Sequence, residues 1–217
     1  MRIDRNSRGT LALVYLLSIA AGCALLLFVH IPWIVWPLIA LLLWFCAWQT
    51  AFFRVPERTY GGSPDSVTSV ADGTVVIAEK VFEDEYLKRE CIQLSVYMNF
   101  FDVHANFWPV SGEITYSCYH PGKHFLAFKP KASDENEHHC VGIRTPEGKE
   151  IFFKQLAGTF ARRIVNYARV GDSVTAGEQC GIIKFGSRID LYLPLDADIR
   201  VRLGELTRAC ETILAEL

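Results

Sequence analysis

The sequence predicts a mainly β domain with minor helix, a sandwich or barrel of short strands, preceded by an N-terminal transmembrane helical hairpin. The 217 residues include 22 Lys or Arg and 24 Asp or Glu, yet none of these lies between Gly9 and Phe53. Behind that apolar run, short alternating segments separated by turn residues fill the rest of the chain. The net charge of −2 excludes a generally basic nucleic-acid binder, so no nucleic-acid partner is expected.

The uncharged run is too long for a single membrane crossing. As one helix, residues 9–53 would span roughly 68 Å, about twice a ~30 Å hydrocarbon core. Pro32 lacks a backbone donor and disfavours helical geometry in the residue before it. We therefore expect residues 1–53 to form two helices, at about 10–29 and 33–52, joined by a tight turn. Residues 54–217 are long enough for one domain with its own core.

Basic residues flank both ends of this hairpin. Arg2, Arg5 and Arg8 precede the first helix, and Arg54 and Arg58 follow the second. A hairpin places both clusters on one side, which the positive-inside rule makes the cytoplasmic side of the cell (inner) membrane. A cleaved signal peptide and a shallow re-entrant hairpin remain as alternatives.

The soluble part reads as a series of short strands. Strands are expected within 70–78, 91–98, 113–119, 141–145 and 150–155, with a hairpin turn at 146–149. A short helix is expected at 158–165, and a polar loop at 133–137.

The cysteine and histidine pattern does not predict a disulfide framework or a metal site. The chain has seven cysteines, an odd number, and no CxxC, which is typical of reduced thiols. Cys118, His120 and His124, followed by His138-His139-Cys140, match no closed set of ligands. We expect surface histidines and no metal.

The segment from Gly171 to Lys184 resembles the turn of biotinyl/lipoyl-type domains. Its Gly-Asp-x-Val and second glycine, Gly177, fit a tight turn between two strands. A membrane-tethered carrier or adaptor module without enzyme activity is therefore the alternative function. Lys184, however, lacks the usual flanking residues of a modified carrier lysine.

Gly186-Ser187 has chemistry available to it beyond an ordinary turn. A serine hydroxyl held against the preceding carbonyl can attack it and convert the peptide into an ester. Glycine offers the least crowded carbonyl and a backbone that tolerates strain. Elimination of the ester and hydrolysis then give an N-terminal pyruvoyl group.

Six motifs in one order resemble the phosphatidylserine decarboxylase family in its short, membrane-anchored form. The resemblance runs from about residue 50 to 195. The motifs are Phe52-Phe53-Arg54-Val55-Pro56-Glu57-Arg58, Val70-Ala71-Asp72-Gly73, Asn99 to Asn106, Lys131 to Glu137, Gln155 to Gly158 with Ala161 to Ile164, and Phe185 to Asp190.

This resemblance implies a pyruvoyl-dependent lyase that acts on phosphatidylserine in the membrane. Self-cleavage between Gly186 and Ser187 would give a β chain, 1–186, and an α chain, 187–217. The pyruvoyl group made from Ser187 would form a Schiff base with the substrate amine and stabilise the carbanion left by carbon dioxide. Proton return and hydrolysis would release phosphatidylethanolamine.

Three further residues acquire roles from the resemblance. His104 is the candidate acid that protonates the substrate carbon, with a structural histidine as the alternative. Asp72 is the candidate base, or base-orienting carboxylate, for maturation, and an Asx-turn aspartate is its alternative. Arg188 could attract the anionic headgroup or form an ion pair with Asp190.

One departure concerns activation of the serine. Phe107 stands where relatives carry a basic residue, and phenylalanine cannot move a proton. His104 is then left to serve both steps. A relative that matures poorly, or that acts on a related lipid, also fits the motifs, and a homo-oligomer is compatible with the sequence.

Overall fold

The computed structural model describes residues 1–125, 135–158, 163–184 and 186–217. These residues divide into two compact units, Met1–Glu57 and Arg58–Leu217. The first unit holds the helices and the second holds most of the strands. A mainly β domain and a pair of N-terminal apolar helices are therefore confirmed.

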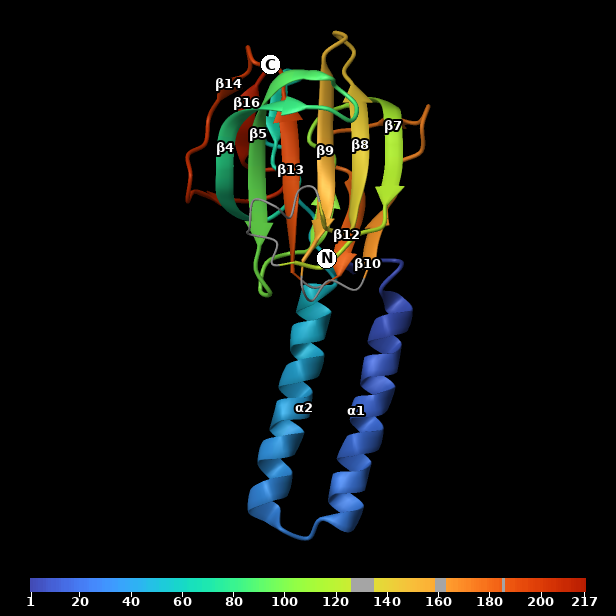
Figure 1. The fold of residues 1–217 in the computed structure, drawn as a ribbon. Coiled ribbons are helices and arrows are strands. Elements are labelled where there is room, and N and C mark those ends of the chain that lie inside the picture. The colour runs from blue at the N-terminus through green and yellow to red at the C-terminus, as the bar shows by residue number, and fades with distance from the viewer. Residues whose placement is uncertain (126–134, 159–162, 185) are drawn as a thin grey trace. The chain divides into compact units, whose positions relative to one another are not determined.

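The first unit is a hairpin of two helices, α1 (Arg8–Phe28) and α2 (Pro32–Phe52). They run side by side in Figure 1. Both are long and apolar enough to cross a membrane. Proline at the first position of α2 has no amide to leave unpaired and a φ suited to the helix. Pro32 therefore starts the second helix, one residue before the position expected from the sequence.

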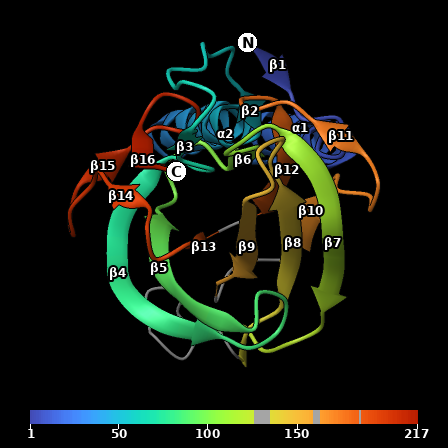
Figure 2. The ribbon, with the colours of Figure 1, turned by 90° about the horizontal axis from the view of Figure 1, so that it is seen from above.

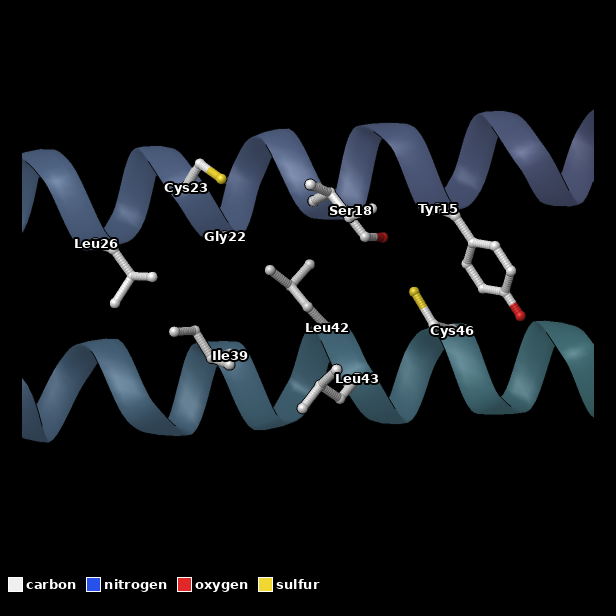
Figure 3. A pocket seen from close by; sticks show the side chains of 10 residues that line it. Tyr15, Ser18, Gly22, Cys23, Leu26, Ile39, Leu42, Leu43 and Cys46 are labelled. Carbon is white, nitrogen blue, oxygen red and sulfur yellow. The ribbon is translucent and has the colours of Figure 1, made fainter.

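The two helices face each other through apolar side chains. Figure 3 shows Leu26 of α1 opposite Ile39 of α2, and Leu42 of α2 pointing toward α1 near Gly22. Near the other end of the hairpin the Tyr15 hydroxyl pairs with the Thr50 hydroxyl, which also bonds to a backbone carbonyl of its own helix. Interhelical pairing satisfies these polar groups inside an otherwise apolar surface.

The two ends of the hairpin are joined by a short antiparallel ladder. Strand β1 (Arg2–Ile3) pairs with β2 (Arg54–Val55). Arg2 lies opposite Val55, and Ile3 lies opposite Arg54. Arg2, before α1, and Arg54, after α2, are therefore on the same side of the hairpin.

An eight-stranded antiparallel sheet forms the frame of the second unit. Seen from above in Figure 2, this sheet curls into a half-barrel. In spatial order its strands are β11 (Ser173–Val174), β7 (Gly112–His120), β8 (His138–Arg144), β9 (Glu150–Ala157), β13 (Ser187–Leu193), β5 (Arg89–Met98), β4 (Gly73–Glu83) and β15 (Leu206–Thr207).

Two three-stranded sheets complete this unit. One consists of β10 (Arg163–Asn166), β12 (Gln179–Lys184) and β6 (Ala105–Phe107). The other consists of β14 (Asp198–Ile199), β16 (Ile213–Glu216) and β3 (Ser66–Thr68). Apolar residues of both small sheets join the main core, which lies on one face of the large sheet.

The central strand β13 is buried on both of its faces. Ile189, Leu191 and Leu193 point into the main core. Tyr192 belongs to a second, smaller cluster with Phe152 on the opposite face. Successive side chains of a strand alternate between faces, so burial on both sides makes every residue of β13 inaccessible.

The expected strands are confirmed, and so is the turn at 146–149. The Gly148 amide bonds to the carbonyl of Thr145 at 2.9 Å. The helix expected at 158–165 is wrong for 163–165, which belong to β10. Ile164 and Val165 are β-branched, and β12 offers them a complete ladder. Residues 126–134, 159–162 and 185, with the parts of motifs that they carry, lie outside the described residues.

Candidate active site

Ser187 is the first residue of β13 and lies at one end of the large sheet. It is opposite Met98 of β5 on one side and Ala157 of β9 on the other. Its side chain is fully buried, and its hydroxyl donates to the Met98 sulfur at 3.7 Å. A thioether is a weak acceptor, so this contact leaves the hydroxyl only loosely held.

The Gly186 carbonyl, the group that Ser187 is expected to attack, accepts a hydrogen bond. The donor is the backbone amide of Gly158, just after β9, at 2.8 Å. Gly186 itself has φ of +65°, a left-handed conformation that costs other residues roughly 1–2 kcal/mol. A Cβ at this position would meet only the Phe100 ring, at 3.9 Å. The need for glycine here is therefore conformational, and an amide is already aimed at the oxygen where charge would develop.

His104 lies immediately before β6 and is fully buried. Its Nδ1 is 3.0 Å from the carbonyl oxygen of Asp102. A carbonyl can only accept, so this bond places the proton on Nδ1 and the lone pair on Nε2. The His104 carbonyl in turn accepts from the Ile183 amide at 3.2 Å, which ties the loop to β12 shortly before Gly186.

A chain of buried amides links the two sheets around Ser187. Asn106 donates to the Met98 sulfur at 3.8 Å and accepts from Gln155 at 2.7 Å. Asn166 of β10 donates to Gln155, also at 2.7 Å. Met98, which contacts the Ser187 hydroxyl, is thus held by residues of β6, β9 and β10. His104, two residues before Asn106, is brought to the same end of the sheet.

A glycine in β12 makes room for this chain of amides. A Cβ at Gly181 would lie 2.3 Å from the Val165 carbonyl and 2.9 Å from the Gln155 amide nitrogen. Backbone atoms cannot yield at such distances, so a larger residue would separate β10 from β12. Gln155, Gly158 and Asn106 all lie inside the sequence motifs, but the sequence alone predicted no role for them.

Asp72 lies in the connection between β3 and β4. Both of its carboxylate oxygens bond to the Arg58 guanidinium, one of them at 2.6 Å, and one oxygen also accepts from the Ala209 amide at 2.9 Å. Two residues earlier, the Val70 carbonyl accepts from the Phe107 amide of β6 at 2.9 Å. Asp72 therefore anchors the turn that supports β6, and it is not an isolated Asx-turn residue.

Arg188 points away from the Ser187 face and is fully buried. Its guanidinium bonds to Asp190 at 2.7 Å and 2.9 Å. Asp190 also accepts from the Ser95 hydroxyl at 2.6 Å. Of the two roles that the sequence left open for Arg188, the structure shows the ion pair. Removing one partner of such a pair leaves a buried charge uncompensated.

Three further side chains covered by expectations from the sequence, those of Phe107, Lys184 and His138, are buried. Phe107 of β6 is buried, and its apolar ring offers no proton acceptor. Lys184 of β12 is only 7% exposed, whereas a carrier lysine has to be reached by its modifying enzyme. His138 is buried as well, so the expectation of a surface histidine is wrong for this residue.

Comparison with known proteins places this geometry in a family. Residues 45–215 match the family model described as phosphatidylserine decarboxylase. A phosphatidylserine decarboxylase proenzyme of Amoebophilus asiaticus is 46% identical over 170 residues, which cover 78% of this chain and 76% of the relative. A proenzyme of Bacteroides thetaiotaomicron is 45% identical over 167 residues, covering 76% and 73%.

A third relative extends the likeness into the helical hairpin. The phosphatidylserine decarboxylase proenzyme of Desulfotalea psychrophila is 36% identical over 209 residues, which cover 96% of this chain and 92% of the relative. The matches span most of each protein, and the family model includes every residue discussed above around Ser187. The chain belongs to the phosphatidylserine decarboxylase family.

Proposed function

We propose that this chain converts phosphatidylserine into phosphatidylethanolamine through a pyruvoyl group made from its own Ser187. The observation that carries this proposal is the junction of β13, where a buried serine hydroxyl follows a left-handed glycine. The Gly186 carbonyl at that junction already accepts the Gly158 amide at 2.8 Å. The proenzyme names of the relatives support the same chemistry.

Self-cleavage needs no reagent other than water. The Ser187 oxygen attacks the Gly186 carbonyl carbon, the carbon–nitrogen bond breaks, and the peptide becomes an ester. Loss of the Ser187 α-proton and departure of the Gly186 carboxylate leave a dehydroalanine at position 187. Water then converts this residue into the pyruvoyl group, and ammonia leaves. The Gly158 amide stabilises the negative oxygen in the first step.

Replacing the Gly158 amide tests this role. Gly158→Pro removes the donor, and proline pushes the preceding residue toward extended geometry, which Ala157 in β9 already has. We expect cleavage to slow by about 10²–10³-fold, the usual effect of losing one oxyanion donor. Gly158→Ala keeps the amide and is the matched control. Cleavage at the wild-type rate in a folded Gly158→Pro protein would show that the hydrogen bond is incidental.

His104 is the group that we assign to proton transfer. With Nδ1–H committed to the Asp102 carbonyl, Nε2 can accept a proton from the serine hydroxyl. After maturation the protonated ring can return a proton to the substrate carbon. Because His104 serves both steps, no second proton-transfer group is needed at position 107 of β6, where this chain has phenylalanine. His104 is fully buried, and such burial excludes competing water.

Asp72 is proposed to serve maturation through its carboxylate, as the base or as the group that orients the base, in addition to anchoring the turn that supports β6. Asp72→Asn removes the charge, whereas Arg58→Gln removes the same ion pair from the other side. We expect Asp72→Asn to slow cleavage more strongly than Arg58→Gln when both proteins are compared at matched thermal stability. Equal cleavage rates would mean that Asp72 acts only through its ion pair. Densitometry of the precursor and the 1–186 chain over time measures both rates.

Cleavage also explains how a buried residue meets a lipid headgroup. In the uncleaved chain Ser187 and His104 are both fully buried. Breaking the bond before Ser187 frees the end of residues 1–186 from β13 and opens the junction. Residues 187–217 stay attached because β13 pairs with β5 and β9 along its length. The pyruvoyl ketone supplies an electron sink for the carbanion that remains when carbon dioxide leaves.

The hairpin is proposed to anchor this chemistry at the inner membrane, with the β domain in the cytoplasm. Arg2 and Arg54, from the two ends of the hairpin, lie together on the β1–β2 ladder, as the positive-inside rule requires of a cytoplasmic face. Anchoring raises the concentration of the enzyme near its lipid substrate.

Trapping with a reducing agent tests the proposed function. Borohydride added to purified protein with headgroup-labelled phosphatidylserine should attach the label to the fragment that begins at residue 187. Ser187→Ala is the control and should take up no label. Label on residues 1–186, or release of carbon dioxide without any borohydride-sensitive attachment, would contradict the proposal.

A further inference from the structure

Four potential metal ligands converge on the face of the large sheet opposite Ser187. Glu85 comes from the connection between β4 and β5, His120 ends β7, and His138 and Cys140 lie on β8. One ligand atom from each residue lies within 4.8 Å of the other three. Figure 1 shows β7 and β8 as neighbours, and Cys140 belongs to the smaller apolar cluster rather than to the main core.

The ligand set matches the preferences of zinc. Imidazole, thiolate and carboxylate are the groups that Zn²⁺ binds in proteins, usually as four ligands in a tetrahedron. Bond lengths of about 2.0–2.3 Å place tetrahedral ligand atoms roughly 3.3–3.8 Å apart. The observed limit of 4.8 Å is therefore within about 1 Å of that geometry, a change that side-chain rotation can supply.

His138 is oriented as a metal ligand would be. Its Nδ1 lies 2.6 Å from the backbone carbonyl oxygen of Asn136. Because that oxygen can only accept, Nδ1 carries the proton and Nε2 the lone pair. Metal-bound histidines typically have such a partner on the other ring nitrogen. The His120 ring stacks on His138 with centroids 4.6 Å apart, and its Nε2 lies 2.8 Å from Glu85.

The charges of the four groups also suit a metal. The Cys140 thiol donates to Glu85 at 3.3 Å. A metal must displace this thiol proton, and one Zn²⁺ then balances one thiolate and one carboxylate.

The Lys154 ammonium competes with a bound metal ion for the Glu85 carboxylate. Its ammonium lies 3.2 Å from Glu85 and 3.9 Å from Glu83. Glu83 is fixed by backbone amides of the connection that carries Glu85, at 2.7–3.1 Å. Lys154 can therefore release Glu85 and keep Glu83 as its partner, at a cost in metal affinity.

We propose that Glu85, His120, His138 and Cys140 form a zinc site that ties the β4–β5 connection to β7 and β8. The site is structural and separate from the junction at Ser187, because the two lie on opposite faces of the sheet. Its function is to hold the connection against the sheet, where Tyr86 packs on Phe152 with centroids 5.6 Å apart.

Zinc titration of the full-length protein in detergent, after treatment with a chelator, tests this site. We expect one zinc per chain and a higher Tm when zinc is added. Cys140→Ser and His138→Gln should weaken binding by more than about 100-fold, since each removes a direct ligand. His139→Gln and Cys23→Ser are the matched controls and should bind as the wild type does. Lys154→Met should bind zinc more tightly than the wild type does, because it removes the ammonium that pairs with Glu85.

A substitute variant is available if Cys140→Ser does not fold, and two results would contradict the proposal. If Cys140→Ser fails to fold, His120→Asn replaces it, because the His120 side chain is 36% exposed and a change there disturbs the core least. Zinc bound equally by wild type, His138→Gln and His120→Asn would overturn the proposal. So would a wild-type protein that takes up no zinc and shows no change in Tm.

Discussion

Ser187→Ala is expected to remain a single uncleaved chain with no decarboxylase activity. Alanine lacks the oxygen that attacks Gly186, and no other route makes the pyruvoyl group. The fold should persist, because the Ser187 hydroxyl contributes only a weak contact to the Met98 sulfur at 3.7 Å. Denaturing electrophoresis and release of carbon dioxide from labelled phosphatidylserine measure the two losses.

The control for this variant is Ser173→Ala, which changes an exposed serine of β11. It should mature and turn over as the wild type does. A 187–217 fragment produced by Ser187→Ala would rule out Ser187 as the nucleophile. Activity in an uncleaved chain would rule out the whole mechanism.

His104→Ala is expected to lower turnover of cleaved protein by about 10²–10⁴-fold, the usual contribution of a general acid. The ring is fully buried, and its Nδ1 bond to the Asp102 carbonyl selects the tautomer that carries its proton on Nδ1. Because we assign both steps to His104, cleavage should slow as well. Turnover must therefore be divided by the amount of cleaved chain, measured on the same gel.

The exposed His124 provides the matched control. His124→Gln should leave both cleavage and turnover unchanged. If His104→Ala matures normally and turns over at the wild-type rate, the histidine is structural. If it matures normally but turns over slowly, another group activates Ser187, and only the acid role of His104 stands.

The sequence was sufficient for the features that depend on local pattern. The absence of charge between Gly9 and Phe53, broken by Pro32, predicted both helices. Alternation predicted β5 and β7. Gly186-Ser187 could be singled out because the proposed rearrangement joins two adjacent residues.

Features that depend on the pairing of distant strands could not be predicted. The Gly158 amide reaches the Gly186 carbonyl only because β9 and β13 pair in one register. The local sequence of residues 163–165 predicts a helix, but in the structure these residues form a strand because β12 pairs with them.

The direction in which side chains point could not be predicted from the sequence either. Arg188 turns toward Asp190 because it lies on the other face of the strand from Ser187. The ion pair of Arg58 and Asp72 includes the Ala209 backbone, from the far end of the chain. Likewise, His120 and His138 meet only where β7 and β8 pair. Residue spacing alone therefore failed to predict that these two histidines would lie together.

The most direct test of the central claim is the intact mass of the purified protein under denaturing conditions. Cleavage with pyruvoyl formation predicts two chains, residues 1–186 and residues 187–217. The smaller chain should be lighter by one ammonia than a chain that begins with serine, and it should resist N-terminal sequencing. A single chain of 217 residues in fully active protein would contradict the account, and so would a small chain that begins with serine.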